Sequence, residues 1–153
     1  MMKTLLFVFL LCSSLKAEYK IIENENIFKV KIKNSIFEEN LVNLKNQINF
    51  ESFMTIYEID VAKATNETAI ALNKKGVLEK GVNLGICKST FALQMLEENY
   101  NNINFCPLSL SIYQKENNVI YISFKKYKPL NKNEKNANKI NESLKNLIIK
   151  SLD

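Results

Sequence analysis

Three short segments of the sequence alternate apolar and polar side chains, and this period of two limits what the chain can fold into. Residues 27–32 alternate Phe, Val and Ile with Lys, and residues 108–113 and 119–124 show a similar pattern. Successive side chains of a strand point to opposite faces, so each segment is predicted to be a half-buried strand. Strands of a parallel sheet covered on both faces are apolar throughout. The pattern therefore favours a sheet with one covered face, and residues 114–118 are predicted to join the last two strands as a hairpin.

Helical periodicity in four other segments supplies the layer that covers this face. Apolar residues at positions 37, 41, 44 and 48 recur at steps of three and four, as on one face of a helix. The helices are predicted at residues 37–48, 61–75 (ending at Gly76), 90–99 (with Ser89 as cap) and about 133–152. Two further strands are predicted at residues 53–59 and 81–87. The expected fold class is α+β: a two-layer, mostly antiparallel sheet with helices packed on one face.

The composition fits one ordinary domain and removes several kinds of chemistry. The chain has 153 residues, 46% of them hydrophobic, with only three Gly and two Pro. It has no His, which excludes Ser-His-Asp and Cys-His nucleophile systems and His-bound zinc. All 21 basic residues are Lys and Asn is abundant, a bias typical of an AT-rich genome. Because Arg, which reads guanine edges, is absent, the net charge of +5 is weak evidence for a nucleic-acid partner, and we expect none.

The first 17 residues have the pattern of a secretory signal peptide. A short basic opening is followed by an apolar run from Leu5 to Cys12 and small residues ending at Ala17. The apolar run is too short to span a bilayer, which needs about 20 residues, so no transmembrane segment is expected. We predict cleavage near Ala17 and a periplasmic or secreted protein. Lipidation of Cys12 is the alternative to its removal, although the bulky Leu11 before it is unfavourable for a lipoprotein signal.

Removal of the signal peptide leaves two cysteines, Cys87 and Cys106, in an oxidising compartment. Cys87 is predicted at a strand end, just before a helix N-terminus and next to Lys88. Both neighbours favour the thiolate form of Cys87. If the two cysteines lie at the same end of the sheet, a disulfide can close. If the intervening helix joins parallel strands, they lie at opposite ends, about 20 Å apart, and no bridge is possible.

A soft-metal site is a further use for these thiols, because thiolate and thioether ligands would replace the missing imidazoles. Met54 and Met95 are the remaining sulfur candidates, although a Met on a strand or helix face is more often part of a core. The sequence indicates no catalytic residue and no established set of metal ligands, and it leaves open whether a cofactor binds. Cys87 and Cys106 are therefore the candidate functional thiols.

Several segments, in this order, resemble a known family, the domain of unknown function DUF302. They are the helix at 37–48, Tyr57-Glu58-Ile59-Asp60-Val61, Gly85-Ile86-Cys87-Lys88, Phe105-Cys106-Pro107 and Ser111-Ile112-Tyr113. The resemblance covers about residues 30–128 and implies a small α+β domain at residues 18–130 with a curved antiparallel sheet. Members of the family are often dimeric and many are exported, so a homodimer is expected. The amphipathic helix at residues 131–153 is expected to be an addition outside the family core.

No activity is established for this family, so the resemblance implies a fold and no reaction. Whether the chain is an enzyme is left open by the sequence. We expect an exported, non-catalytic binding or accessory protein of the bacterial periplasm, with a small molecule or a protein as partner. The alternative is a thiol-redox or soft-metal-binding protein that uses Cys87 and Cys106. A structural subunit of the cell envelope is a third class.

Overall fold

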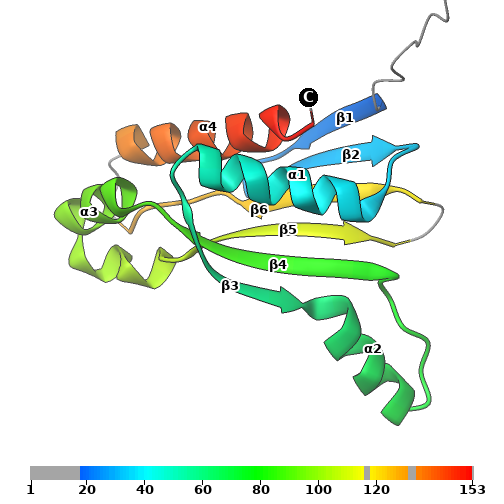
Figure 1. The fold of residues 1–153 in the computed structure, drawn as a ribbon. Helices are drawn as coiled ribbons and strands as arrows, with labels where there is room; N and C mark the ends of the chain where they lie inside the picture. The colour runs from blue at the N-terminus through cyan, green and yellow to red at the C-terminus, as the bar shows by residue number, and fades with distance from the viewer. Residues whose placement is uncertain (1–17, 116–117, 131–133, 153) are drawn as a thin grey trace, which may run out of the picture.

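The structure, a computed structural model, describes residues 18–115, 118–130 and 134–152. Its centre is a six-stranded sheet in the order β1-β2-β6-β5-β4-β3, in which every neighbouring pair is antiparallel. The sheet is curved and does not close on itself (Figure 1). The strands are β1 (Glu18–Glu23), β2 (Ile27–Lys33), β3 (Met54–Asp60), β4 (Lys80–Cys87), β5 (Leu108–Gln114) and β6 (Ile120–Lys125). The predicted α+β class with an antiparallel sheet is confirmed.

The helices occupy one face and both ends of this sheet. They are α1 (Phe37–Phe50), α2 (Val61–Ala71), α3 (Ser89–Glu98), the 3-10 helix η1 (Tyr100–Phe105) and α4 (Glu134–Lys150). Helices α1 and α4 lie side by side over one face, whereas α3 and η1 lie at the end where β4 stops and β5 begins (Figure 1). Helix α2 extends from the opposite end, and Ala62 is its one buried residue.

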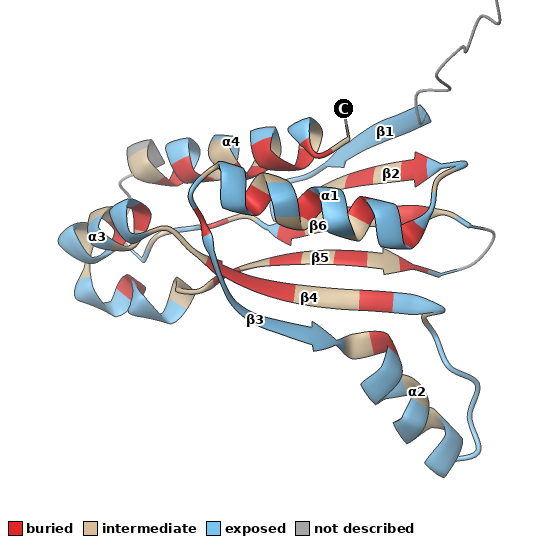
Figure 2. Ribbon diagram, in the orientation of Figure 1, coloured by how far each residue is buried: buried red, intermediate tan, exposed pale blue. Residues whose placement is uncertain are grey.

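The core lies between the sheet and the helices, where the sequence pattern places it. Phe28, Val30 and Ile32 of β2 are buried, and the intervening Lys residues are not (Figure 2). Helix α4 contributes the predicted apolar stripe: Ala137, Ile140, Leu144, Leu147 and Ile148 are all buried in the same cluster. The C-terminal helix therefore shares one core with the residues that precede it.

The local ends of some elements differ from the prediction. Helix α2 ends at Ala71, before Gly76, because the chain turns at Asn73, whose φ is 54°. Ser89 is the first residue of α3 rather than its cap; Lys88 takes the cap position without a side-chain cap hydrogen bond. The sequence did not predict β1, all of whose residues are exposed, because an edge strand of this kind has no burial pattern.

Within the described ranges, no helix combines the length and the apolar character needed to cross a bilayer. The predicted signal peptide, with Cys12 and the cleavage position near Ala17, lies outside the described residues.

Candidate functional site

The two cysteines lie at the same end of the sheet. Strands β4 and β5 are antiparallel neighbours, and Ile86 pairs with Leu108, so the end of one strand lies beside the start of the other. Cys87 is the last residue of β4, and Cys106 directly follows η1. Their Sγ atoms are 3.3 Å apart. Of the two arrangements that the sequence allowed, the structure therefore has the one in which the thiols meet.

Both thiols are free and half-buried in this arrangement. Burial, together with the neighbouring Cys87, raises the pKa of the Cys106 thiol to about 11. Cys106 is therefore protonated at neutral pH. The pair can close a disulfide if an oxidant removes two electrons and two protons, or it can hold a soft metal ion in place of the two protons.

The Lys88 ammonium is engaged by groups other than Cys87. Its ammonium donates a hydrogen bond to the carbonyl oxygen of Glu51 at 2.9 Å. It also lies 5.2 Å from the ring centre of Phe53 and 5.5 Å from that of Phe91, both core residues. Since adjacent residues of an extended chain point to opposite faces, Lys88 is directed toward the helix layer and away from Cys87.

The structure separates the two methionine candidates. Met54 is the cross-strand partner of Cys87 in the ladder between β3 and β4, and half of its surface is exposed. Met95 is fully buried in the core on α3. Only Met54 therefore lies near the thiol pair. In the part of the chain that the structure describes, no group of three or more His, Cys, Asp or Glu residues could hold a metal ion.

A second site lies on the sheet face that α1 and α4 leave uncovered, which we call the open face. It is formed by alternate residues of the four strands β3 to β6: Tyr57, Asn83, Gly85, Ser109, Ser111, Tyr113, Tyr121 and Ser123. Sequence reasoning missed this face as a site. The alternation of Ser109, Ser111 and Tyr113 opposite buried Leu and Ile was its available signal, because small hydroxyls on a strand leave room above the sheet.

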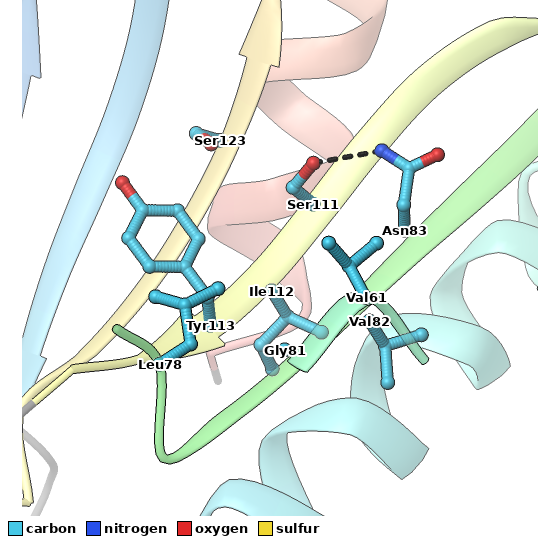
Figure 3. Close-up of a pocket in the computed structure, with 9 residues that line it drawn as sticks. All are labelled: Val61, Leu78, Gly81, Val82, Asn83, Ser111, Ile112, Tyr113 and Ser123. Carbon is cyan, nitrogen blue, oxygen red and sulfur yellow. Dashed lines mark hydrogen bonds between the residues drawn. The ribbon is translucent and has the colours of Figure 1, made fainter. Parts of the chain in front are cut away.

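A pocket of about 260 Å³ opens on this face near the start of α2. Its polar side is lined by Asn83, Ser111 and Ser123, and Val61, Leu78 and Tyr113 form its larger walls (Figure 3).

The polar side of the pocket is held by hydrogen bonds within the sheet. The Asn83 side-chain amide donates to Ser109 Oγ at 2.7 Å and to Ser111 Oγ at 2.9 Å. Of these two hydroxyls only Ser111 lines the pocket, where it keeps its own proton to donate, and Asn83 keeps its carbonyl oxygen as an acceptor. The polar side therefore offers donors and an acceptor in fixed positions.

The aromatic wall of the pocket is also fixed. The rings of Tyr113 and Tyr121 stack with centroids 5.2 Å apart and planes 19° from parallel. The Lys29 ammonium lies 5.3 Å from the Tyr121 ring centre, on the side away from β4. Burial raises the pKa of the Tyr113 phenol above its ordinary value, so this hydroxyl stays neutral at physiological pH.

Comparisons with known proteins identify the family. The family model for a domain of unknown function, DUF302, matches residues 28–151, a range that extends beyond residue 128 through α4. A crystal structure of an uncharacterised conserved DUF302 protein from Bacillus stearothermophilus has a similar fold, with a TM-score of 0.70 and 20% sequence identity. The similarity covers 84% of this chain and 99% of that one. No curated protein matches the chain. On the strength of a family match that takes in most of the sequence, the chain belongs to the DUF302 family.

Proposed function

We propose that the protein is an exported, non-catalytic binding protein of the bacterial periplasm, and that its ligand is a small molecule held in the open-face pocket. Export rests on the signal-peptide pattern of residues 1–17. The binding function rests on one observation: the uncovered face of the sheet carries a pocket with apolar walls and a small, preorganised polar side (Figure 3). Ligand sites generally combine these two kinds of lining.

The lining indicates the chemical class of the ligand. A volume of about 260 Å³ accommodates a single ring with a few substituents. Tyr113 offers a rigid ring face, and Val61 and Leu78 offer apolar contact opposite the polar side. The hydroxyl of Ser111 and the amide of Asn83 would orient hydrogen-bonding groups of the ligand. We therefore infer a neutral, ring-bearing molecule with polar groups on one edge.

The same lining supports binding rather than catalysis. Among the described residues that line the pocket, there is no carboxylate, thiol or ammonium group. The titratable group is the Tyr113 phenol, which burial keeps neutral. A general acid or base works best when its pKa lies near the working pH, and the pKa of Tyr113 is shifted away from it.

Two matched substitutions test this site. Ser111→Val and Ser109→Val each remove one acceptor of the Asn83 amide and add similar bulk to β5, but only Ser111 lines the pocket. A library of small heterocyclic and aromatic fragments is screened by saturation-transfer NMR. We expect binding to the wild type and to Ser109→Val, and a loss of at least tenfold in affinity for Ser111→Val. An absence of fragment binding, or equal losses in both variants, would contradict the pocket as the site.

A thiol-redox function is the second candidate, favoured by the 3.3 Å separation of the Cys87 and Cys106 sulfur atoms. In such a reaction, the Cys87 thiolate attacks a disulfide of a partner protein and releases one partner thiol. Cys106, after losing its proton, attacks Cys87 Sγ, releases the second thiol and leaves the Cys87–Cys106 disulfide. The partner is thereby reduced by two electrons.

The redox candidate is tested by counting free thiols in natively purified protein and measuring alkylation by iodoacetamide against pH. A redox protein is expected to show rapid alkylation of Cys87 at neutral pH, slow alkylation of Cys106, and a reversible disulfide. A bridge that resists dithiothreitol, or a Cys87 that does not react at neutral pH, would exclude this function.

A further inference from the structure

We propose that Cys87, Cys106 and Met54 form a binding site for one copper(I) ion, at the end of the sheet where β4 stops. This site is separate from the open-face pocket and goes beyond the proposed binding of a small molecule. It is carried by the meeting of the two thiols and by the cross-strand pairing of Met54 with Cys87.

The first observation is the meeting of the two thiols. Cys87 precedes the segment formed by α3 and η1 and Cys106 follows it, yet their Sγ atoms are 3.3 Å apart. Both side chains are half-buried, so the sulfur atoms are shielded from bulk water without being sealed in the core. The backbone thus delivers two soft ligands to one point.

The second observation concerns the third sulfur atom. Met54 pairs directly with Cys87 across the β3–β4 ladder. Directly paired residues of antiparallel strands project from the same face, with their Cβ atoms about 4.5–5.5 Å apart. Met54 has three rotatable side-chain bonds and is 54% exposed, so its thioether can turn toward Cys87 without leaving a core position. Strand β3 is an edge strand, which leaves this side open to an entering ion.

The chemistry of this donor set selects the metal. Thiolate and thioether ligands bind soft ions such as copper(I) in preference to hard cations, which prefer oxygen ligands. Structural zinc sites take four ligands in a tetrahedron, mostly Cys and His. The chain has no His, and within the described ranges no third Cys, Asp or Glu completes a group with these two cysteines. Three sulfur ligands without oxygen or nitrogen partners suit copper(I) and do not suit zinc(II).

Binding is a ligand exchange without a change of oxidation state. Two S–H bonds are broken and two S–Cu bonds are formed, and the two protons pass to solvent. The Met54 thioether donates a lone pair to the copper ion and releases no proton. The complex carries one net negative charge, and the N-terminus of α3, which begins two residues after Cys87, contributes a partial positive charge beside it.

The test is an anaerobic titration of reduced, metal-free protein with copper(I), in competition with the chromophoric chelator bathocuproine disulfonate. We expect one ion per chain. Cys87→Ser and Cys106→Ser should each weaken binding by at least 100-fold, and Met54→Leu by about tenfold. Met95→Leu is the matched control, because it removes a thioether that is buried in the core, and its affinity should equal that of the wild type. Circular dichroism of each variant confirms that it is folded.

Three results would overturn the site. The first is that the reduced wild type binds no copper(I). The second is that Cys87→Ser and Cys106→Ser both bind copper(I) as tightly as the wild type. The third is that Met54→Leu and the wild type have equal affinities for copper(I). Zinc(II) that displaces copper(I) would also contradict the assignment. Fragment binding to the metal-free protein is measured independently, so failure of the metal site leaves the small-molecule proposal standing, and the reverse also holds.

Discussion

Asn102 is a fully buried amide that joins three segments near the thiol end of the molecule. Its side-chain Nδ2 donates to the carbonyl oxygen of Met95 in α3 at 3.0 Å, and its Oδ1 accepts from the backbone N–H of Leu130 at 3.2 Å. The segment after β6 is thereby held against α3 and η1. The sequence has 22 Asn residues, so nothing in the pattern distinguishes this one from its exposed neighbours.

Replacing Asn102 with Ala is expected to lower the free energy of unfolding by about 2–4 kcal/mol, because both backbone partners are left without the amide in a buried place. Asn104→Ala is the control, since the Asn104 side chain is exposed and donates its hydrogen bond to the carbonyl oxygen of Asn101, three residues away. Urea denaturation followed by circular dichroism measures both variants. Equal free energies of unfolding for the two variants would show that the buried Asn102 amide does not stabilise the fold.

Position 85 needs a glycine because a neighbouring aromatic ring leaves no room for a side chain there, and not because of its backbone conformation. A Cβ atom placed at Gly85 would lie 2.2–2.5 Å from three carbon atoms of the Tyr57 ring, which crosses β4 on the open face. The Gly-x-Cys motif that supported the family resemblance therefore has a packing reason that the sequence alone did not reveal. The motif fixes where Tyr57 can lie.

A double-mutant cycle tests this contact. Gly85→Ala is expected to destabilise the protein by about 1–2 kcal/mol, because Tyr57 must swing away from the strand. In a Tyr57→Ala background the same substitution should cost much less, since the clashing ring is gone. Thermal or urea unfolding of the four proteins gives the coupling energy. A cost of Gly85→Ala that is the same in both backgrounds would rule out the ring as its cause.

At the scale of elements, one carboxylate forms ion pairs that link β1, the residue after β6 and α4. Glu23, at the end of β1, forms ion pairs with Lys126 at 2.5 Å and with Lys145 of α4 at 2.7 Å. The hydrogen bonds from Lys126 and then Lys145 hold the pKa of Glu23 below its ordinary value of 4.5. The edge strand β1, which has little burial of its own, is thus linked to the C-terminal helix.

The sign of the pH dependence follows from the lowered pKa of Glu23. The unfolded chain takes up the proton at a higher pH than the folded chain, so the stabilisation is complete above the ordinary pKa. It is lost as the pH falls below about 4.5 and through the lower, folded pKa. Glu23→Gln is expected to lower the free energy of unfolding by about 1 kcal/mol at pH 7, and by much less at pH 3.

Urea unfolding of wild type and Glu23→Gln at both pH values measures this difference. Glu25→Gln serves as the control, because Glu25 is highly exposed and its one ion pair among the described residues is with Lys128, and we expect no measurable change. A Glu23→Gln effect of equal size at pH 3 and pH 7 would mean that the carboxylate charge does not hold β1 in place.

At the scale of the whole molecule, the periodicities predicted the fold class well but could not fix how the cysteines meet. The alternating segments correctly marked β2, β5 and β6, because one face of each strand is buried. The thiol pair depended on the direction in which η1 returns the chain to the sheet, and this irregular segment has no period to interpret. The open face was missed for a related reason: small polar residues on a strand resemble an ordinary solvent-exposed surface.

The proposed export of the protein is tested on the whole chain. We expect the protein to lie in the periplasmic fraction of its cell and to begin at Glu18, because the signal-peptide pattern ends at Ala17. Intact-mass spectrometry of the natively expressed protein measures this. A cytoplasmic protein that retains residues 1–17 would contradict export, and a lipid adduct on Cys12 would show anchoring instead.

The ladder between β2 and β6 has a consequence for how the chain assembles. Every other ladder joins strands that are consecutive in the sequence, whereas this one pairs Ile27 with Lys125 and so unites the two ends of the domain. Closing so long a loop carries an entropic cost that consecutive pairs avoid. The edge of β2 that faces away from β1 therefore stays unpaired until β6 has emerged, almost the whole length of the domain later. We therefore expect the β1–β2 hairpin to join the rest of the sheet late in folding, after the strands from β3 to β6 have paired with their neighbours.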